Sequence, residues 1–243
     1  MYEWRKMTAS QREDALHVRE LRRMPFHGPP HYGSDVPCVY HLTAACYEHR
    51  PILGKTPLRM AAFEKELVEV LGVGAFVVPP SGGSSAGAAC AVAVEPPEGG
   101  TTNGIPAKAG TTNGEKSLLL YWCVLPNHWH ALVRTDRLRA VVQRVGRLHG
   151  SSSHLWNGED DARGRTCWHR CADRRMRSEA HTHATVNYIL NNPVHHGYAE
   201  RWQDWPYSNA CDYLHHVGEQ EAARRWRDYP IRDYGKGWDD AEL

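Results

Sequence analysis

One stretch, LLLYWCVLPNHWHALVR at 118–134, constrains the fold more than any other part of the chain. Its first eight residues are nearly all apolar, Pro126 and Asn127 favour a turn, and the residues after them are typical of a second strand. The stretch therefore predicts a β-hairpin. Because side chains alternate across a strand, His128 and His130 should point to the same face, while Trp129 points into the core.

The segments around this hairpin predict an α+β fold. Residues 36–49 and 165–178 are typical of strands, 56–72 and 137–156 of helices, and 179–192 of a helix that Pro193 and Gly197 should end. The order of elements is βαββαβα. We therefore expect a ferredoxin-like antiparallel sheet with helices packed on one side and the histidine hairpin at its centre.

Composition divides the chain into parts. Residues 1–34 predict a short helix and an extended arm rich in Pro, Gly and His, and the main domain is expected at 35–199. Residues 72–115 are rich in small residues and repeat the sequence TTNG, which indicates a mobile surface insertion. The extension at 200–243 is rich in aromatic residues, which we expect to pack on the core more often than to stack on bases. These are Trp202, Trp205, Tyr207, Tyr213, Trp226, Tyr229, Tyr234 and Trp238.

Composition also limits where the protein works and what it binds. The longest apolar run, 118–125, is too short to span a bilayer, and the first residues lack a hydrophobic signal core, so we expect a cytoplasmic protein with no membrane partner. The seven cysteines lack framework spacing and fit a reducing compartment. A net charge of +1 argues against a general nucleic-acid binder.

Positive charge is nevertheless concentrated in one region. Residues 134–187 hold 11 arginines and no lysine against six acidic residues, and arginine suits bidentate phosphate contacts. The alternative is an ordinary solvated helix face in a chain whose codons favour arginine. Candidate contacts to a DNA backbone are Arg134, Arg137, Arg139, Arg144 and Arg147.

The histidine pair is weak as a motif and gains its meaning from the predicted strand. Among 16 histidines, chance alone gives about one H-x-H pattern, and a second one, His181 and His183, lies in a predicted helix where the two side chains point apart. A metal site needs a third group. Tyr188 and Asn192 are four residues apart on one helix face, with Asn191 less well aligned. The alternative is a half-buried tyrosine and a helix-capping asparagine.

Together these motifs resemble a known family. LPNHWHALVR, followed about sixty residues later by VNYILNNPVHHG, resembles the single-tyrosine HUH transposases and, within them, the REP-associated tyrosine transposases. The resemblance covers most of the chain apart from the insertion. It implies that 35–199 is an HUH/tyrosine catalytic domain in which His128 and His130 bind a metal, Asn192 is the third ligand and Tyr188 is the nucleophile. The implied cofactor is Mg²⁺ or Mn²⁺.

The resemblance also implies an activity and a partner. The protein would be a metal-dependent single-strand DNA endonuclease and strand transferase, acting on hairpin or palindromic DNA through a covalent 5′-phosphotyrosine. Single-stranded or hairpin DNA, such as repetitive palindromes, would be its partner. The protein would be a nucleoid-associated monomer or homodimer.

Three alternatives stay open from the residues alone. The first is a protein of the same fold that binds palindromes without cutting them. The second is a zinc protein using Cys167, His169 and Cys171. The third is an unrelated metal-dependent hydrolase in which Tyr188 is structural.

Overall fold

A computed structural model describes residues 37–72 and 117–231, with a few positions between 8 and 17. All of the elements described below belong to one compact unit. The predicted insertion at 72–115 lies outside the described residues except for Gly72, and most of the N-terminal helix and arm lies outside them as well. The last residues of the C-terminal extension, with Tyr234 and Trp238, are also not described.

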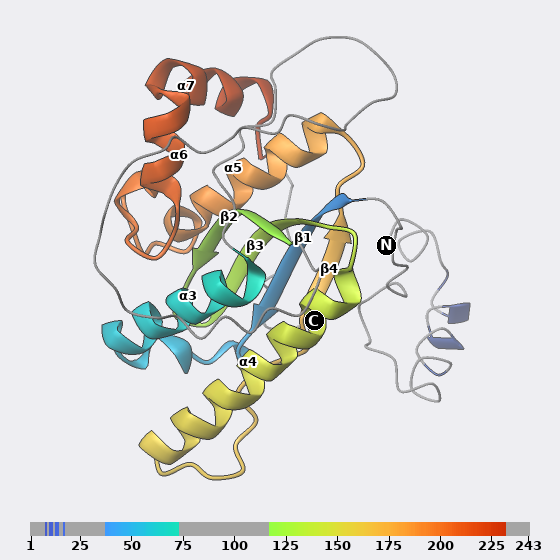
Figure 1. Cartoon of the computed structure of the whole chain (residues 1–243), viewed down its shortest axis with the longest axis vertical. Helices are drawn as coiled ribbons and strands as arrows, with labels where there is room; N and C mark the ends of the chain where they lie inside the picture. Colours follow the sequence, from blue (N-terminus) through green and yellow to red (C-terminus); the bar gives the residue numbers. More distant parts are fainter. Residues whose placement is uncertain are drawn as a thin grey trace, which may run out of the picture. The chain divides into compact units, whose positions relative to one another are not determined.

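The fold is α+β, as predicted, and is built on a four-stranded antiparallel sheet (Figure 1). Its strands are β1 (Cys38–Ala45), β2 (Leu118–Val124), β3 (His128–Thr135) and β4 (Ala172–Arg175). They lie in the order β2-β3-β1-β4, which is the order of a ferredoxin-like sheet. The histidine strand β3 is therefore an inner strand, whereas its hairpin partner β2 lies at the edge.

Eight helical elements accompany the sheet within the described residues. They are η1 (Tyr47–His49), η2 (Leu53–Lys55), α3 (Pro57–Leu71), α4 (Leu138–Glu159), α5 (Glu179–His195), η3 (Trp202–Asp204), α6 (Ala210–Val217) and α7 (Glu219–Asp228). None of the described helices is long and apolar enough to cross a membrane. The strand predicted at 165–178 is shorter than expected, because only four residues pair with β1.

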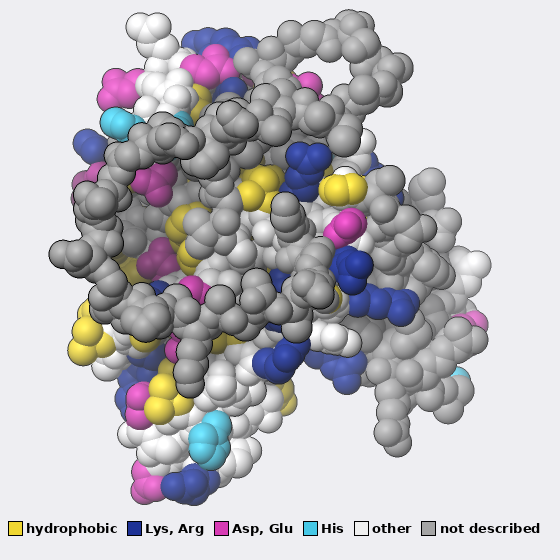
Figure 2. Space-filling model, viewed as in Figure 1, with side chains coloured by type: hydrophobic (Ala, Val, Ile, Leu, Met, Phe, Trp, Pro, Cys, Tyr) yellow, Lys and Arg dark blue, Asp and Glu magenta, His cyan; other side chains and the backbone are white. Residues whose placement is uncertain are grey.

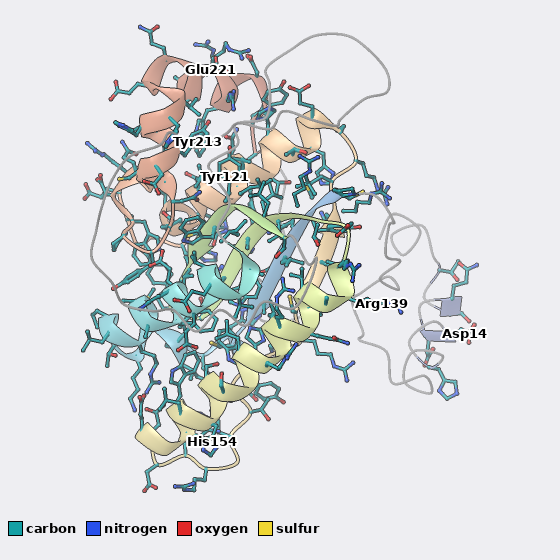
Figure 3. The ribbon with its side chains drawn as sticks, in the orientation of Figure 1. Asp14, Tyr121, Arg139, His154, Tyr213 and Glu221 are labelled. Atoms are coloured by element: carbon teal, nitrogen blue, oxygen red, sulfur yellow. The ribbon has the colours of Figure 1, made fainter. Side chains whose placement is uncertain are left out.

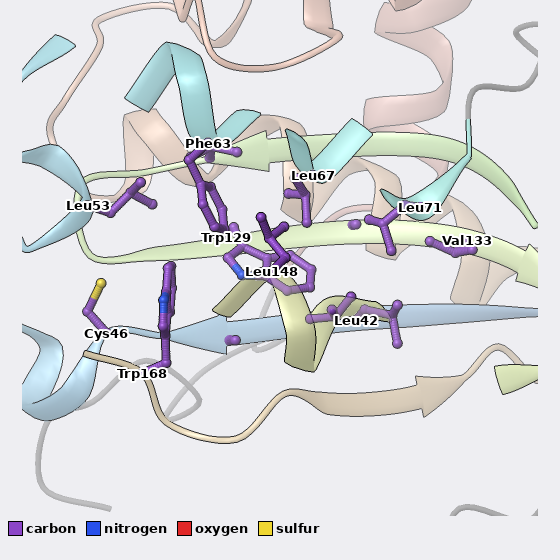
Figure 4. Close-up of a cluster of buried hydrophobic side chains, with 14 of the residues drawn as sticks. Leu42, Cys46, Leu53, Phe63, Leu67, Leu71, Trp129, Val133, Leu148 and Trp168 are labelled. Atoms are coloured by element: carbon purple, nitrogen blue, oxygen red, sulfur yellow. The ribbon is translucent and has the colours of Figure 1, made fainter. Parts of the chain in front are cut away.

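The two crossover helices, α3 and α4, pack together on one side of the sheet, as expected for this fold. Phe63 of α3 and Leu148 of α4 meet Leu42, Trp129 and Val133 of the sheet in one buried cluster (Figure 4). These strand residues share one face because side chains alternate along β1 and β3. This face holds the main hydrophobic core.

The opposite face of the sheet is covered by α5 and the C-terminal helices. Tyr121 and Leu132 of the sheet form a second buried cluster with Ile189 and Leu190 of α5 and with Tyr213 of α6. The described aromatic residues of the extension take part in packing, as predicted; for example, Trp202 stacks on Trp226. By alternation, His128 and His130 point to this side, so α5 is the helix they face.

The free edge of β2 is bonded by residues of the C-terminal extension. Asn209 donates from Nδ2 to the carbonyl of Leu120 (2.9 Å) and accepts at Oδ1 from the backbone N–H of Trp122 (3.1 Å). The backbone N–H of Val124 donates to the carbonyl of Tyr207 (2.8 Å). The extension thus satisfies the exposed ladder of β2, which would otherwise be a site for unwanted strand pairing.

The end of α5 corrects one prediction. Pro193 does not end the helix but lies inside its last turn, and α5 runs to His195. A proline near the end of a helix removes only its own N–H, and the turn keeps other bonds, such as His196 N–H to Asn192 O (3.1 Å). Gly197, with φ of 72°, follows the end of the helix. Because α5 continues to His195, Asn192 lies within the helix.

Candidate functional site

The histidine pair is placed by the turn between β2 and β3. The carbonyl of Asn127 accepts from Cys46 N–H (2.6 Å), and the carbonyl of Pro126 accepts from Gly54 N–H (2.7 Å). Gly54 lies so close to Pro126 that a Cβ atom would stand 2.2 Å from the proline side chain. The turn is therefore clamped by the segment after β1, which fixes where His128 begins its strand.

Trp129 anchors the strand between the two histidines from the other side of the sheet. Its Nε1–H donates to Nε2 of His149 on α4 (3.1 Å), and His149 stacks on Trp168 with ring centroids 4.3 Å apart. Burial lowers the pKa of His149 to about 3, so the ring stays neutral and can accept this hydrogen bond. The register of β3, and with it the direction of both site histidines, is held by this contact.

Helix α5 brings the two remaining predicted residues to the histidines. Asn192 Oδ1 lies 2.8 Å from Nε2 of His128, and the Tyr188 and His130 ring centroids are 5.2 Å apart in an edge-on arrangement. All four side chains are buried, and none is more than 5% exposed. Sixty residues apart in sequence, the pairs form one cluster, which we call the candidate site.

The hydrogen bonds around His128 fix where its proton lies. Asn127 donates from Nδ2 to the carbonyl of His49 (3.2 Å), which orients its amide, and its Oδ1 lies 2.8 Å from Nδ1 of His128. Since Oδ1 can only accept, His128 donates from Nδ1, and the lone pair of the neutral ring is at Nε2. That lone pair faces the amide oxygen of Asn192. Two acceptors 2.8 Å apart are stabilised by a cation that both bind, by protonation of the ring, or by rotation of the amide.

This donor set is compatible with a divalent cation. Two imidazoles and an amide oxygen are neutral ligands, so a bound ion keeps its full charge and several open positions. Nδ2 of Asn192 is buried and has no hydrogen-bond partner among residues 37–72 and 117–231, as expected when an amide is held for its oxygen. No group of three or more His, Cys, Asp or Glu side chains in the described part of the chain is arranged to bind a metal.

The zinc alternative requires Cys167, His169 and Cys171 to form one metal-binding group, and the described part of the chain contains no such group. Cys167 is buried and donates from Sγ to Oδ1 of Asn157 (3.2 Å), while Nε2 of His169 accepts from the backbone N–H of Glu48 (3.1 Å). Cys171, the third candidate ligand, has its Sγ 3.7 Å from the carbonyl of Ala172, so all three side chains of the C-x-H-x-C segment have local partners. The six described cysteines are free thiols.

Two histidines near the candidate site were not predicted from the sequence. His41 of β1 lies 3.1 Å from His130, between Nε2 and Nδ1, and the ring of His196 lies 4.9 Å from that of His128 between centroids. His41 is separated from His130 by 89 residues, and only the pairing of β1 with β3 brings them together. The one available signal was the alternation of β1, which places His41 on the face opposite Leu42.

The arginines predicted to contact DNA do not form one surface with the candidate site. Arg134 of β3 shares the face of His128 but lies about 20 Å further along the strand, given ~3.3 Å per residue. Arg137, Arg139 and Arg147 are exposed at or on α4, which covers the other face of the sheet. Figure 3 labels Arg139 near the start of that helix, and dark blue side chains gather in the same region of Figure 2.

Arg144 is held by groups at the end of α3, unlike the exposed Arg147. Its Nε–H donates to the carbonyl of Val70 (2.9 Å) and its Nη2 to Oγ of Ser117 (2.8 Å), so this guanidinium ties α4 to the end of α3. Helical spacing alone could not distinguish Arg144 from Arg147, because the partner groups come from elements distant in sequence.

A different arginine lies on the face of the candidate site. Arg174 of β4 pairs with His41 of β1, so the two side chains share one face of the sheet. Burial, followed by the charges of Arg174 and Arg177, lowers the pKa of His181 at the start of α5. Both arginines therefore lie near the N-terminus of the helix that carries Tyr188.

Comparison with known proteins gives one weak structural similarity. No protein-family model matches the chain, and no curated protein sequence matches it. A solved structure of a REP-associated tyrosine transposase bound to a REP hairpin is similar, with 16% sequence identity and a TM-score of 0.42. The match covers 74% of this chain and 81% of that chain. At such a low sequence identity and TM-score, the chemistry of the candidate site has to be inferred from its own residues.

Proposed function

We propose that the protein is a metal-dependent single-strand DNA endonuclease and strand transferase of the HUH tyrosine type. The observation that carries this proposal is the convergence of His128 and His130 with Tyr188 and Asn192. The 2.8 Å contact between His128 and Asn192 and the adjacent rings of His130 and Tyr188 support it. A tyrosine beside a neutral three-ligand cluster is suited to phosphoryl transfer without a carboxylate nucleophile or base.

The ion would be held by His128, His130 and Asn192, with Mg²⁺ or Mn²⁺ as the expected occupant. When bound, such an ion supplies charge that polarises a scissile phosphate and helps to orient it. Imidazole nitrogen favours Mn²⁺ over Mg²⁺, because the affinity of nitrogen ligands is lower for the harder ion. We therefore expect tighter binding of Mn²⁺.

Tyr188 would act as the nucleophile. Its phenolic oxygen forms a bond to the scissile phosphorus while the bond from phosphorus to the 3′ oxygen breaks. The phenol loses one proton and the 3′ oxygen gains one, so the products are a 5′-phosphotyrosine and a free 3′-hydroxyl. Attack by another 3′-hydroxyl reverses the step and joins a new strand. The phosphodiester energy is kept in the tyrosine link, so ATP is not needed.

The DNA substrate would be single-stranded beside a hairpin or palindrome. This expectation comes from the family resemblance of the motifs, and the exposed arginines support contact with a phosphate backbone. Because Arg174 shares the face of the candidate site, it is a stronger candidate for contacts near the scissile phosphate than the α4 arginines. Those of α4 would hold DNA only if it extends around the sheet.

One observation favours a second candidate function. Tyr188 is 5% exposed, so most of its side chain is covered by neighbouring residues. A protein of this fold that binds palindromic DNA without cutting it would need no access of DNA to this side chain. The two functions are separated by a cleavage assay.

The test uses a library of hairpin oligonucleotides with randomised single-stranded flanks. The library is incubated with the full chain in three separate reactions, containing Mn²⁺, Mg²⁺ or EDTA, and the products are sequenced. We expect cleavage at one position relative to the stem, with Mn²⁺ or Mg²⁺ and not with EDTA. Binding of the hairpins without cleavage in any arm would favour the second candidate. Cleavage that persists in EDTA would contradict the metal dependence.

A further inference from the structure

A buried histidine on a neighbouring strand is in contact with the candidate site. His41 lies on β1, which pairs with β3 so that Thr43 stands opposite His130 and His41 opposite Leu132. Directly paired residues share a face, so His41 and His130 point to the same side of the sheet. His41 is 2% exposed, and its Nε2 lies 3.1 Å from Nδ1 of His130.

The contact leaves two possible positions for the shared proton. If His41 donates, the neutral His130 ring carries its own proton at Nε2, where it cannot bind a cation. If His41 accepts, His130 carries its proton at Nδ1, and the lone pair of Nε2 is available. The partner of one ring nitrogen therefore decides whether the other nitrogen can be a ligand.

The neighbouring histidine supports the second arrangement. His128 donates from Nδ1 to the amide oxygen of Asn127, which directs its Nε2 lone pair toward Asn192. If both rings bind one cation through Nε2, each must carry its proton at Nδ1. An acceptor at Nδ1 of His130 would complete the set, and His41 is the group found there.

The rings are also fixed in orientation. The centroids of His41 and His130 lie 5.2 Å apart, and Tyr188 stands edge-on to both, at 5.2 Å from His130 and 6.2 Å from His41. Any rotation of the His130 ring would change its contacts with both neighbours. His41 therefore lies where it can set the direction as well as the tautomer of His130.

We propose that His41 is a positioning residue that accepts the Nδ1 proton of His130 and so directs the Nε2 lone pair of His130 into the candidate site. This inference rests on the proposed metal-binding function but concerns a residue outside the predicted ligand set. His41 would not touch the cation or the DNA. Its effect would pass through the tautomer of His130.

The first test needs neither metal nor DNA. Two-bond ¹⁵N–¹H correlation spectra of the ¹⁵N-histidine-labelled chain report the tautomer of each ring, and the His130 signal is identified by its absence from a His130→Asn variant. We expect His130 to carry its proton at Nδ1 in the metal-free wild type. A His130 ring protonated at Nε2 alone would overturn the proposal, even if no variant of His41 folds.

The second test compares two substitutions of His41. In His41→Gln the amide oxygen can take the place of the Nε2 acceptor, whereas His41→Leu keeps a similar volume without an acceptor. Mn²⁺ affinity, followed by electron paramagnetic resonance, should fall about 10- to 100-fold in His41→Leu. In His41→Gln it should stay within about threefold of wild type. Equal Mn²⁺ affinity in His41→Leu and wild type would contradict the positioning role.

Failure of the proposed function would look different. If the wild type binds no Mn²⁺ and cleaves no hairpin, the metal-dependent function is wrong. The tautomer of His130 in the metal-free chain still decides whether His41 is its acceptor. The two conclusions are therefore separable.

Discussion

Asn192 Oδ1 lies 2.8 Å from His128 Nε2, and this contact joins the first residue of β3 to the C-terminal half of α5. It is possible because α5 crosses the face of the sheet opposite to the one covered by α3 and α4. Had the histidines pointed to the other face, they would lie in the main core with Phe63 and Leu148. The site therefore depends on the register of β3, which directs His128 and His130 to the face covered by α5.

The amide of Asn192 should be a ligand through its oxygen. We expect Asn192→Asp, which keeps an oxygen and adds charge, to bind Mn²⁺ more tightly than wild type, because carboxylates are strong ligands for hard cations. Asn192→Leu should lose most of the affinity. Titration calorimetry with Mn²⁺ measures both. Equal affinity in wild type and Asn192→Leu would remove Asn192 from the ligand set.

The histidine pair should be responsible for stabilisation by metal. A ligand that binds only the folded state adds about 2.7 kcal/mol at 100 times its Kd, which raises the melting temperature. This increase with Mn²⁺ should disappear when both His128 and His130 are replaced by alanine. The exposed His154 on α4, labelled in Figure 3, provides the control. His154→Ala should melt with the same Mn²⁺ shift as wild type, and a full shift in the double variant would place the metal elsewhere.

Two arginines one turn apart on α4 should have different roles. Arg147 is exposed, so Arg147→Gln should weaken binding to all hairpin sequences alike and reduce the slope of log Kd against log salt by about 0.7, the value for one phosphate contact to a single strand. Arg144→Gln should instead lower the free energy of unfolding by about 1–2 kcal/mol, since its partners are Val70 and Ser117. Fluorescence anisotropy and urea denaturation separate the two effects. A binding defect confined to Arg144→Gln would reverse the assignment.

The buried His149 should make stability depend on pH. Its pKa is lowered by burial to about 3, below the ordinary value of about 6.5 that it regains on unfolding. Between these values the unfolded chain binds the proton and the folded chain does not. Its contribution is therefore complete above pH 6.5 and falls by about 1.4 kcal/mol per pH unit as the pH drops toward 3.

The measurement is urea denaturation from pH 4 to pH 7.5, with His149→Gln as the comparison. Glutamine keeps an acceptor for Trp129 without a titrating ring. The free energy of unfolding should depend less steeply on pH in His149→Gln than in wild type. Parallel curves would mean that His149 is not the group that titrates.

Much of this site was predictable because it depends on local periodicity. Alternation along 128–134 places both histidines on one face, and a spacing of four places Tyr188 and Asn192 on one side of a helix. The sequence could not show that His41 lies beside His130, since strand pairing across 89 residues has no local signature. For the same reason Arg144 could not be distinguished from Arg147. The prediction that Pro193 ends α5 was wrong, because a proline in the last turn of a helix does not have to interrupt it.

The position of α5 was predictable only in part. A helix was expected after the last strand, and the geometry of a metal site required it to face the histidines. The apolar residues that hold it there, such as Ile189 and Leu190, face Leu132 and Tyr121 of the sheet in the second buried cluster. Apolar residues such as these occur in helices on either face of a sheet, so the sequence does not show which face α5 covers.

The central claim is that Tyr188 forms a covalent bond to DNA, and trapping that bond tests it most directly. A hairpin oligonucleotide labelled on the 3′ side of the cut is incubated with the chain and Mn²⁺, then separated by denaturing electrophoresis. We expect label on the wild-type protein, with peptide mapping to Tyr188, and label also on Tyr198→Phe, in which a nearby exposed tyrosine is removed. Tyr188→Phe keeps the ring and its packing, so it should fold and bind hairpin DNA but carry no label. A labelled Tyr188→Phe protein, or cleavage by it at the wild-type rate, would contradict the claim.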